Sequence, residues 1–183
     1  MGKTYSNISD ELKAFIEEQK LFFVGPAAAD GMISVSPKGL DSLRILDRNR
    51  VMWLNLTGSG NETAAHVREL DRMTLMFCAF AGNPLILRLY GHARAIHRHD
   101  ADWETSYALF NPLPGARQIF DMQVDLVQTS CGMGVPLYDY RGDREQLIDW
   151  ASRKGETGLE KYRAEKNRTS LDGKLTHITE AND

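Results

Sequence analysis

Four short apolar runs follow one another between residues 21 and 56, and turn residues separate each run from the next. The runs cover 21–24, 32–36, 43–46 and 51–56. Apolar runs of this length between turn residues are typical of strands. Because these strands would follow one another without an intervening helix, the pattern favours a mostly antiparallel sheet over a doubly wound parallel one.

The rest of the chain mixes strands with helices. Apolar runs and alternation predict further strands over 74–80, 85–97 and 118–130. Helical spacing predicts helices over about 9–19, with Ser9 as N-cap, over 61–70 and 100–110, and over a C-terminal region of about 144–168 that is interrupted near 155–158. We therefore expect residues 1–183 to form a single domain, mainly β, with about six antiparallel strands in a small barrel and helices at its periphery.

Composition excludes several classes of protein. The chain has 183 residues, 42% of them hydrophobic, and a net charge of −3 without a basic stripe, which argues against a nucleic-acid-binding protein. No segment approaches the roughly 20 continuous apolar residues that a membrane span needs. The N-terminus shows no secretory signal, and Cys78 and Cys131 follow no disulfide pattern. We therefore expect a cytoplasmic protein.

A loop rich in glycine and hydroxyl groups separates the strand 51–56 from the helix 61–70. Its residues are Thr57, Gly58, Ser59, Gly60, Asn61, Glu62 and Thr63. Backbone N–H groups in such a loop, together with the positive end of a helix dipole, can bind a phosphate. A capping box with Ser59 as N-cap and Glu62 three residues later explains the same residues without a ligand. Because neither the Walker nor the dinucleotide spacing is present, the loop alone leaves both interpretations open.

Lys38 follows the second apolar run. If the strand continues to this residue, alternation places Ser34, Ser36 and Lys38 on one face, opposite Ile33 and Val35. That polar face meets either solvent, as on an edge strand, or a polar ligand. Lys38 is a phosphate ligand only if the glycine-rich loop lies beside it.

Three other features have simpler explanations. His97 and His99 occupy alternate positions at a strand end, a poor arrangement for a closed metal cage, so we predict no metal site. Cys131 is a lone thiol in a glycine-containing loop and is better explained by a tight turn than by a nucleophile. Trp150, near the start of the last helix, is more typical of a core residue but could stack on a flat ligand.

In combination, Val35–Gly39, Leu56–Thr63 and Leu87–Gly91 resemble the pyridoxamine 5'-phosphate oxidase-like family of FMN-binding split barrels. Within that family the chain is similar to a branch with the same Ser-Pro-Lys-Gly and Leu-Thr-Gly-Ser-Gly-Asn-Glu-Thr motifs, and the resemblance spans about residues 12–175. It implies a six-stranded antiparallel split β-barrel, a homodimer with FMN between the subunits, and an oxidoreductase of unknown substrate.

The resemblance also implies a site. In the oxidases an Arg and, five residues later, a Lys hold the phosphate; the Lys matches Lys38, whereas Ile33 stands at the Arg position. A second Arg-Lys pair of the oxidases corresponds to Gly60 and Asn61. Lys38 is therefore expected to be the main cation at the phosphate. The residues expected around FMN are Ser36, Lys38, Asn55, Thr57, Gly58, Ser59, Gly60, Asn61 and Thr63, with Trp150 near the distal half of the pocket.

Two other functions remain open at this point. The first is a non-catalytic carrier of flavin or haem. The second is a split barrel without a cofactor that serves as a dimeric structural or interaction protein. Flavin absorbance, a Soret band or the lack of both would distinguish these cases.

Overall fold

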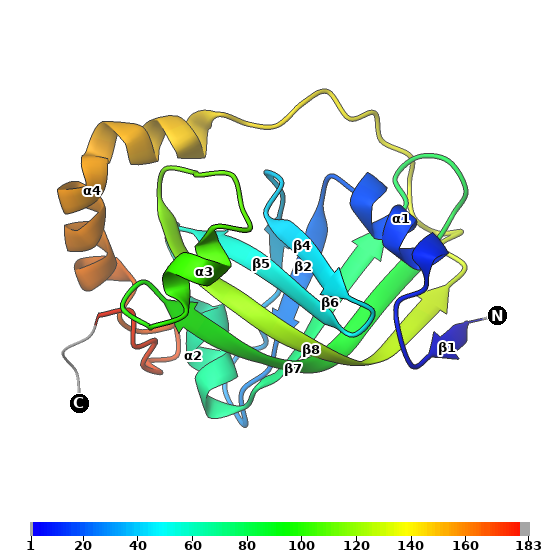
Figure 1. The fold of residues 1–183 in the computed structure, drawn as a ribbon, viewed down its shortest axis with the longest axis horizontal. Coiled ribbons are helices and arrows are strands. Elements are labelled where there is room, and N and C mark those ends of the chain that lie inside the picture. Colours follow the sequence, from blue (N-terminus) through cyan, green and yellow to red (C-terminus); the bar gives the residue numbers. More distant parts are fainter. Residues whose placement is uncertain (1, 180–183) are drawn as a thin grey trace.

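The computed structural model describes residues 2–179 and contains one antiparallel sheet, curled into a half-barrel with helices at its periphery (Figure 1). The order along the sheet is β3-β2-β6-β7-β8-β5-β4, and β1 pairs with β8. The strands are β1 (Lys3–Tyr5), β2 (Phe22–Pro26), β3 (Ser36–Lys38), β4 (Leu43–Asp47), β5 (Arg50–Leu56), β6 (Arg72–Cys78), β7 (Ile86–His97) and β8 (Ala116–Ser130). The helices are α1 (Asp10–Glu18), α2 (Glu62–Glu69), α3 (Trp103–Tyr107) and α4 (Gln146–Lys166).

The expected mainly antiparallel architecture is confirmed, but the count of six strands is wrong, because the sheet has eight. The seven apolar runs correspond to β2 through β8, and the three-residue strand β1 is the one without a predicted counterpart. All residues of β1 are exposed and none belongs to an apolar run, so its pairing with β8 leaves no hydrophobic pattern in the sequence.

The aromatic core lies between the curled walls of the sheet. The Trp53 and Phe120 rings stack with centroids 4.5 Å apart, and Phe22 stacks on Phe77 at 5.7 Å. At one end α1 adds Leu12 and Ile16 to this core. At the other, α2 packs against β7 and β2. This packing positions the start of α2 beside the sheet.

Two expected elements begin or end elsewhere. The expected strand over 32–36 is instead β3 at Ser36–Lys38, and residues 32–35 have irregular structure. Met32, Ile33 and Val35 of this segment are exposed, so the apolar run does not mark a buried strand here. The helix expected over 100–110 is limited to the five residues of α3.

The first and last helices, α1 and α4, lie close to the positions predicted for them. Ser9 caps α1, and its side chain accepts a hydrogen bond from the Leu12 N–H group. In α4, Gly155 has φ 64° and ψ 173°, and this conformation breaks the helix where an interruption was expected.

Residues 131–145 cross from the end of β8 to α4 as an extended segment (Figure 1). In the range 2–179 no helix is both long enough and apolar enough to cross a membrane.

A bulge bends the two longest strands, β7 and β8. Tyr90 pairs with Leu126 and Gly91 pairs with Val124, so Asp125 is an extra residue on β8. A Cβ atom at Gly91 would overlap the backbone carbonyl oxygen of Gln123. The bend therefore requires glycine at this position.

We predict that Gly91→Ala destabilises the protein by about 1–3 kcal/mol or more, because a backbone atom must move to admit the methyl group. Gly134→Ala is the matched control, since no atom lies within 4 Å of its Cβ position. Urea unfolding of both variants measures the difference. Equal stability of Gly91→Ala and wild type would show that the bulge does not depend on glycine.

Candidate functional site

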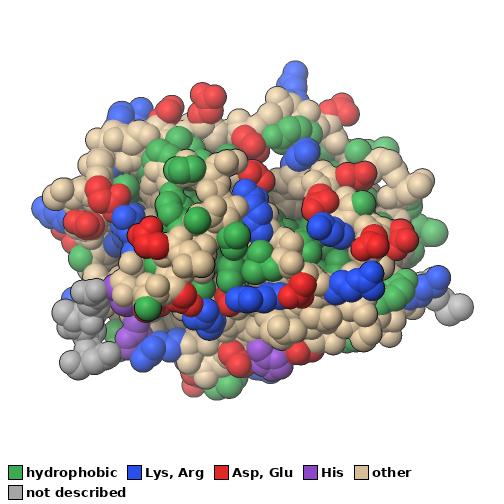
Figure 2. Space-filling model, in the orientation of Figure 1, with side chains coloured by type: hydrophobic (Ala, Val, Ile, Leu, Met, Phe, Trp, Pro, Cys, Tyr) green, Lys and Arg blue, Asp and Glu red, His purple; other side chains and the backbone are tan. Residues whose placement is uncertain are grey.

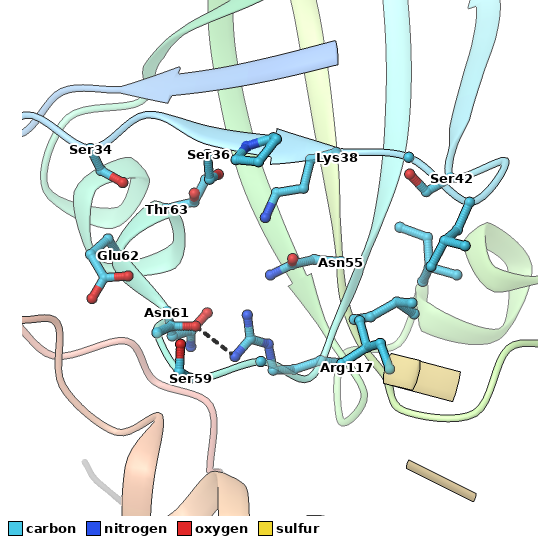
Figure 3. Close-up of a pocket in the computed structure, with 18 residues that line it drawn as sticks. Ser34, Ser36, Lys38, Ser42, Asn55, Ser59, Asn61, Glu62, Thr63 and Arg117 are labelled. Atoms are coloured by element: carbon cyan, nitrogen blue, oxygen red, sulfur yellow. Dashed lines mark hydrogen bonds between the residues drawn. The ribbon is translucent and has the colours of Figure 1, made fainter. Parts of the chain in front are cut away.

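A cavity of about 440 Å³ lies between β3, the segment that follows it, the glycine-rich loop and the start of β8 (Figure 3). Its volume is in the range of small-molecule sites. The residues that line it are Ser34, Ser36, Pro37, Lys38, Gly39, Leu40, Ser42, Leu54, Asn55, Leu56, Gly58, Ser59, Gly60, Asn61, Glu62, Thr63, Arg117 and Leu147.

Lys38 extends from β3 into this cavity (Figure 3). Its ammonium lies 5.2 Å from the centroid of the Trp53 ring. Burial, and then the nearby Arg117 charge, lower the pKa of Lys38 to about 8, while Glu62 acts in the opposite direction. An anion in the cavity would offset both effects and favour the charged ammonium.

Arg117 extends from β8 toward the same space (Figure 3) and is only 3% exposed. Its Nη1 donates hydrogen bonds to the Gly60 carbonyl oxygen (3.0 Å) and to Asn167 Oδ1 (2.8 Å). Its Nε atom has no hydrogen-bond partner among the described residues. Burial, together with the Arg163 charge, lowers the pKa of Arg117 to about 9. The guanidinium is thus fixed on one side and retains an unused donor.

Two serine hydroxyls in the cavity wall also lack partners. The Oγ atoms of Ser36 and Ser42 are buried and make no hydrogen bond within residues 2–179. Since burying a polar group without a partner is costly, three unused donors around one cavity fit a ligand rich in acceptor oxygens. A phosphate is such a ligand, and guanidinium donors match it well.

A chain of amide groups connects the cavity wall to β8. Asn55 Nδ2 donates to Gln118 Oε1 at 3.0 Å, and Gln118 Nε2 donates to Asn61 Oδ1 at 3.0 Å. Asn61 Nδ2 then donates to the Asn167 carbonyl oxygen at 3.2 Å. These bonds hold Asn55 and Asn61 in place without a ligand.

The capping box with Ser59 and Glu62, one of the two interpretations left open for this loop, is not formed. The helix begins at Glu62 and its N-cap is Asn61, whose side chain makes no capping hydrogen bond. Glu62 Oε1 accepts a hydrogen bond from the Leu171 N–H group instead of reaching back to Ser59. The local sequence suggested a cap, but contacts with distant segments determine where these side chains bond.

The structure brings most of the predicted site residues together. Those that line the cavity are Ser36, Lys38, Asn55, Gly58, Ser59, Gly60, Asn61 and Thr63. Thr57 lies elsewhere, since its Oγ1 donates to the Gly115 carbonyl oxygen and accepts from Arg163 Nε. Trp150 packs edge-on against Tyr162 and is not part of the cavity lining.

Arg117 is the principal site residue that sequence reasoning missed. It is the second residue of β8, a strand whose first five residues are all buried. A charged residue at a buried strand position needs a partner, so an arginine at the start of this apolar strand was the sequence signal that could have indicated a site. Because its contacts come from Gly60 and Asn167, far away in the sequence, the local pattern did not identify its position.

A second cavity of about 450 Å³ adjoins the first and shares Gly39, Leu40 and Ser42 with it. Phe22 and Phe77 contribute to its wall. Within residues 2–179 no group of three or more His, Cys, Asp or Glu side chains is arranged to hold a metal ion.

On the face of the molecule shown in Figure 2, acidic and basic side chains are interspersed.

The family model for pyridoxamine 5'-phosphate oxidase matches residues 8–131. The chain belongs to this family. In an alignment of 189 positions, gaps included, it is 35% identical to the pyridoxamine 5'-phosphate oxidase family protein ustO of Aspergillus flavus, and the alignment covers 92% of this chain and 75% of that protein.

Solved structures show the same fold at low sequence identity. A protein of Lactobacillus delbrueckii described as a pyridoxamine 5'-phosphate oxidase is 19% identical, with a TM-score of 0.54 over 67% of this chain and 94% of its own. HupZ from Group A Streptococcus is also 19% identical, with a TM-score of 0.52 over 65% of this chain and 91% of its own. The split-barrel fold is therefore shared with both.

The lowered pKa of Lys38 predicts a pH-dependent stability. The pKa is about 8 in the folded protein and 10.5 ordinarily, so between these values the unfolded chain binds more protons and the free energy of unfolding rises with pH. We expect Lys38→Met to be more stable than wild type at pH 7 by roughly 1–3 kcal/mol, with a difference that shrinks from pH 8 to 10.5. Urea unfolding across this range tests it, and a constant difference would contradict it.

Proposed function

We propose that this protein binds FMN and acts as an oxidoreductase on a small substrate. The observation that supports this most directly is the convergence of Lys38 and Arg117 on one cavity that also contains unpartnered hydroxyl groups. FMN, when bound, would supply the electron-transfer chemistry. The protein would bind its phosphate, orient it and exclude water from it.

The charges of the cavity are matched to a phosphate monoester. Lys38 and Arg117 contribute two positive charges and Glu62 one negative charge. In the absence of an anion, the Arg117 charge disfavours the charged form of Lys38, and the Arg163 charge disfavours the charged form of Arg117. A phosphate with nearly two negative charges would relieve this repulsion and accept hydrogen bonds from Ser36 Oγ and Arg117 Nε. Backbone N–H groups of the loop would add to these contacts.

The site residues give less support to a haem carrier. Haem iron is usually held by His, Cys, Met or Tyr side chains. None of these residue types is among the described residues that line the cavity. A split barrel without a cofactor would leave the convergence of Lys38 and Arg117 without an explanation. The adjoining 450 Å³ cavity is our candidate for the substrate, because it shares a wall with the proposed FMN site.

One prediction of the proposed function concerns phosphate recognition. We expect FMN to bind at least about tenfold more tightly than riboflavin, because hydrogen bonds to a charged group are worth about 1.5–3 kcal/mol. Lys38→Ala and Arg117→Met should each weaken FMN binding by roughly 10- to 150-fold and leave riboflavin binding within about twofold. Flavin fluorescence titration measures both affinities.

Lys161→Met is the control for this prediction, since the Lys161 side chain is 79% exposed on α4. It should bind both flavins like wild type. Equal wild-type affinities for FMN and riboflavin would refute a phosphate site. Normal FMN binding by both cavity variants would place the phosphate elsewhere.

Another prediction of the proposed function concerns assembly. Met32, Ile33 and Val35 are exposed by 62%, 82% and 64%, and they flank the cavity residue Ser34. We propose a homodimer in which a second copy covers this apolar segment. Light scattering should return twice the 20.6 kDa mass of the chain, and Ile33→Glu should shift the protein toward the monomer. A wild-type mass of 20.6 kDa at micromolar concentration would contradict the dimer.

A further inference from the structure

The C-terminal end of α4 contacts the glycine-rich loop. Asn167 is the C-cap of α4 and is 0% exposed. Its Nδ2 group donates to the carbonyl oxygens of Gly58 (3.0 Å) and Ser59 (3.5 Å). Its Oδ1 atom accepts from Arg117 Nη1 at 2.8 Å. One side chain therefore contacts both the loop and the cation that form the proposed phosphate site.

These contacts determine which way the loop faces. In a trans peptide the C=O and N–H groups point in opposite directions, and the described residues contain no cis peptide. Because the Gly58 and Ser59 carbonyls point toward Asn167, the N–H groups of Ser59 and Gly60 point away from it. Ser59 and Gly60 both line the cavity. Both N–H groups therefore lie on the side of the loop that faces away from Asn167, in residues that line the cavity.

Only an amide side chain of this size can make both contacts. It offers an acceptor oxygen to Arg117 and, on the same group, donors to the loop carbonyls. A carboxylate could still accept from Arg117 but could not donate to the loop. It would also neutralise part of the Arg117 charge, whereas the neutral amide leaves that charge available to a ligand.

We propose that Asn167 is a positioning residue for phosphate binding. It fixes Arg117 and the glycine-rich loop in the geometry that binds the anion, and it acts through these groups without contacting the ligand itself. The inference rests on the proposed FMN function. It also explains how a loop with Gly60 and Asn61, where the resemblance places an Arg-Lys pair in the oxidases, can form a phosphate site. Asn167 lies outside the family match at 8–131, so the C-terminal part of the chain contributes this function.

The experiment compares Asn167→Asp and Asn167→Ala for binding of FMN and riboflavin by fluorescence titration. We expect Asn167→Asp to weaken FMN binding by about tenfold or more and Asn167→Ala by roughly 3- to 10-fold. Both should bind riboflavin within about twofold of wild type. Asn167→Ala buries no charge, so it gives the same comparison if the Asp variant does not fold.

Thr176→Val is the matched control. Thr176 Oγ1 donates to the carbonyl oxygens of Asn167 and Arg168, so the variant perturbs the same cluster without removing a contact to Arg117 or to the loop. It should lower the melting temperature and leave the ratio of FMN to riboflavin affinity unchanged. Loss of FMN affinity in this control equal to that in Asn167→Ala would overturn the positioning role.

A double-mutant cycle separates positioning from general destabilisation. In an Arg117→Met background, Asn167→Asp should change the ratio of FMN to riboflavin affinity less than it does in the wild-type background, because only its effect through the loop remains. An equal effect in both backgrounds, or equal losses of FMN and riboflavin binding, would overturn the proposal. If wild type binds both flavins equally, the proposed function itself fails and the positioning role fails with it.

Discussion

The burial of two cations that face the same cavity is the constraint on which this site depends. Lys38 and Arg117 each have a pKa below the ordinary value, and burial is the main cause for both. The folded protein tolerates Arg117 because the Gly60 carbonyl and the Asn167 amide accept its hydrogen bonds. The face of the Trp53 ring, which lies next to the Lys38 ammonium, stabilises that charge. Both side chains line the same cavity.

The fold provides this arrangement from two strands that are not neighbours in the sheet. Lys38 lies on β3, an edge strand, whereas Arg117 lies on β8 inside the sheet. The curl of the sheet brings them to one cavity (Figure 3). The C-terminal helix holds this end together: Arg163 donates to Thr57 and to the Ala116 carbonyl oxygen, next to Arg117 itself. Residues beyond the family match therefore support the proposed site from behind.

Local patterns predicted the elements whose signal is contained in their own residues. Ser9 capped α1 as expected, and alternation located the long strands β7 and β8. The apolar run at 32–36 failed because hydrophobicity there does not reflect burial. The proposed homodimer would give that segment a partner surface, which a single chain does not reveal.

The candidate site was predictable only in part. The glycine-rich loop and Lys38 are recognisable from their motifs, and both line the cavity. Arg117 and Asn167 are not recognisable in this way, because each functions through hydrogen bonds to residues about fifty or more positions away. The resemblance suggested a site with a single cation, whereas the structure adds Arg117 from β8.

A crystal structure of the protein with FMN tests the central claim most directly. The account predicts phosphate oxygens within about 2.7–3.0 Å of Lys38 Nζ and of a guanidinium nitrogen of Arg117. It also predicts that Asn167 keeps its hydrogen bonds to Arg117 and to the loop. A phosphate bound elsewhere, with Lys38 and Arg117 both free of it, would contradict the account.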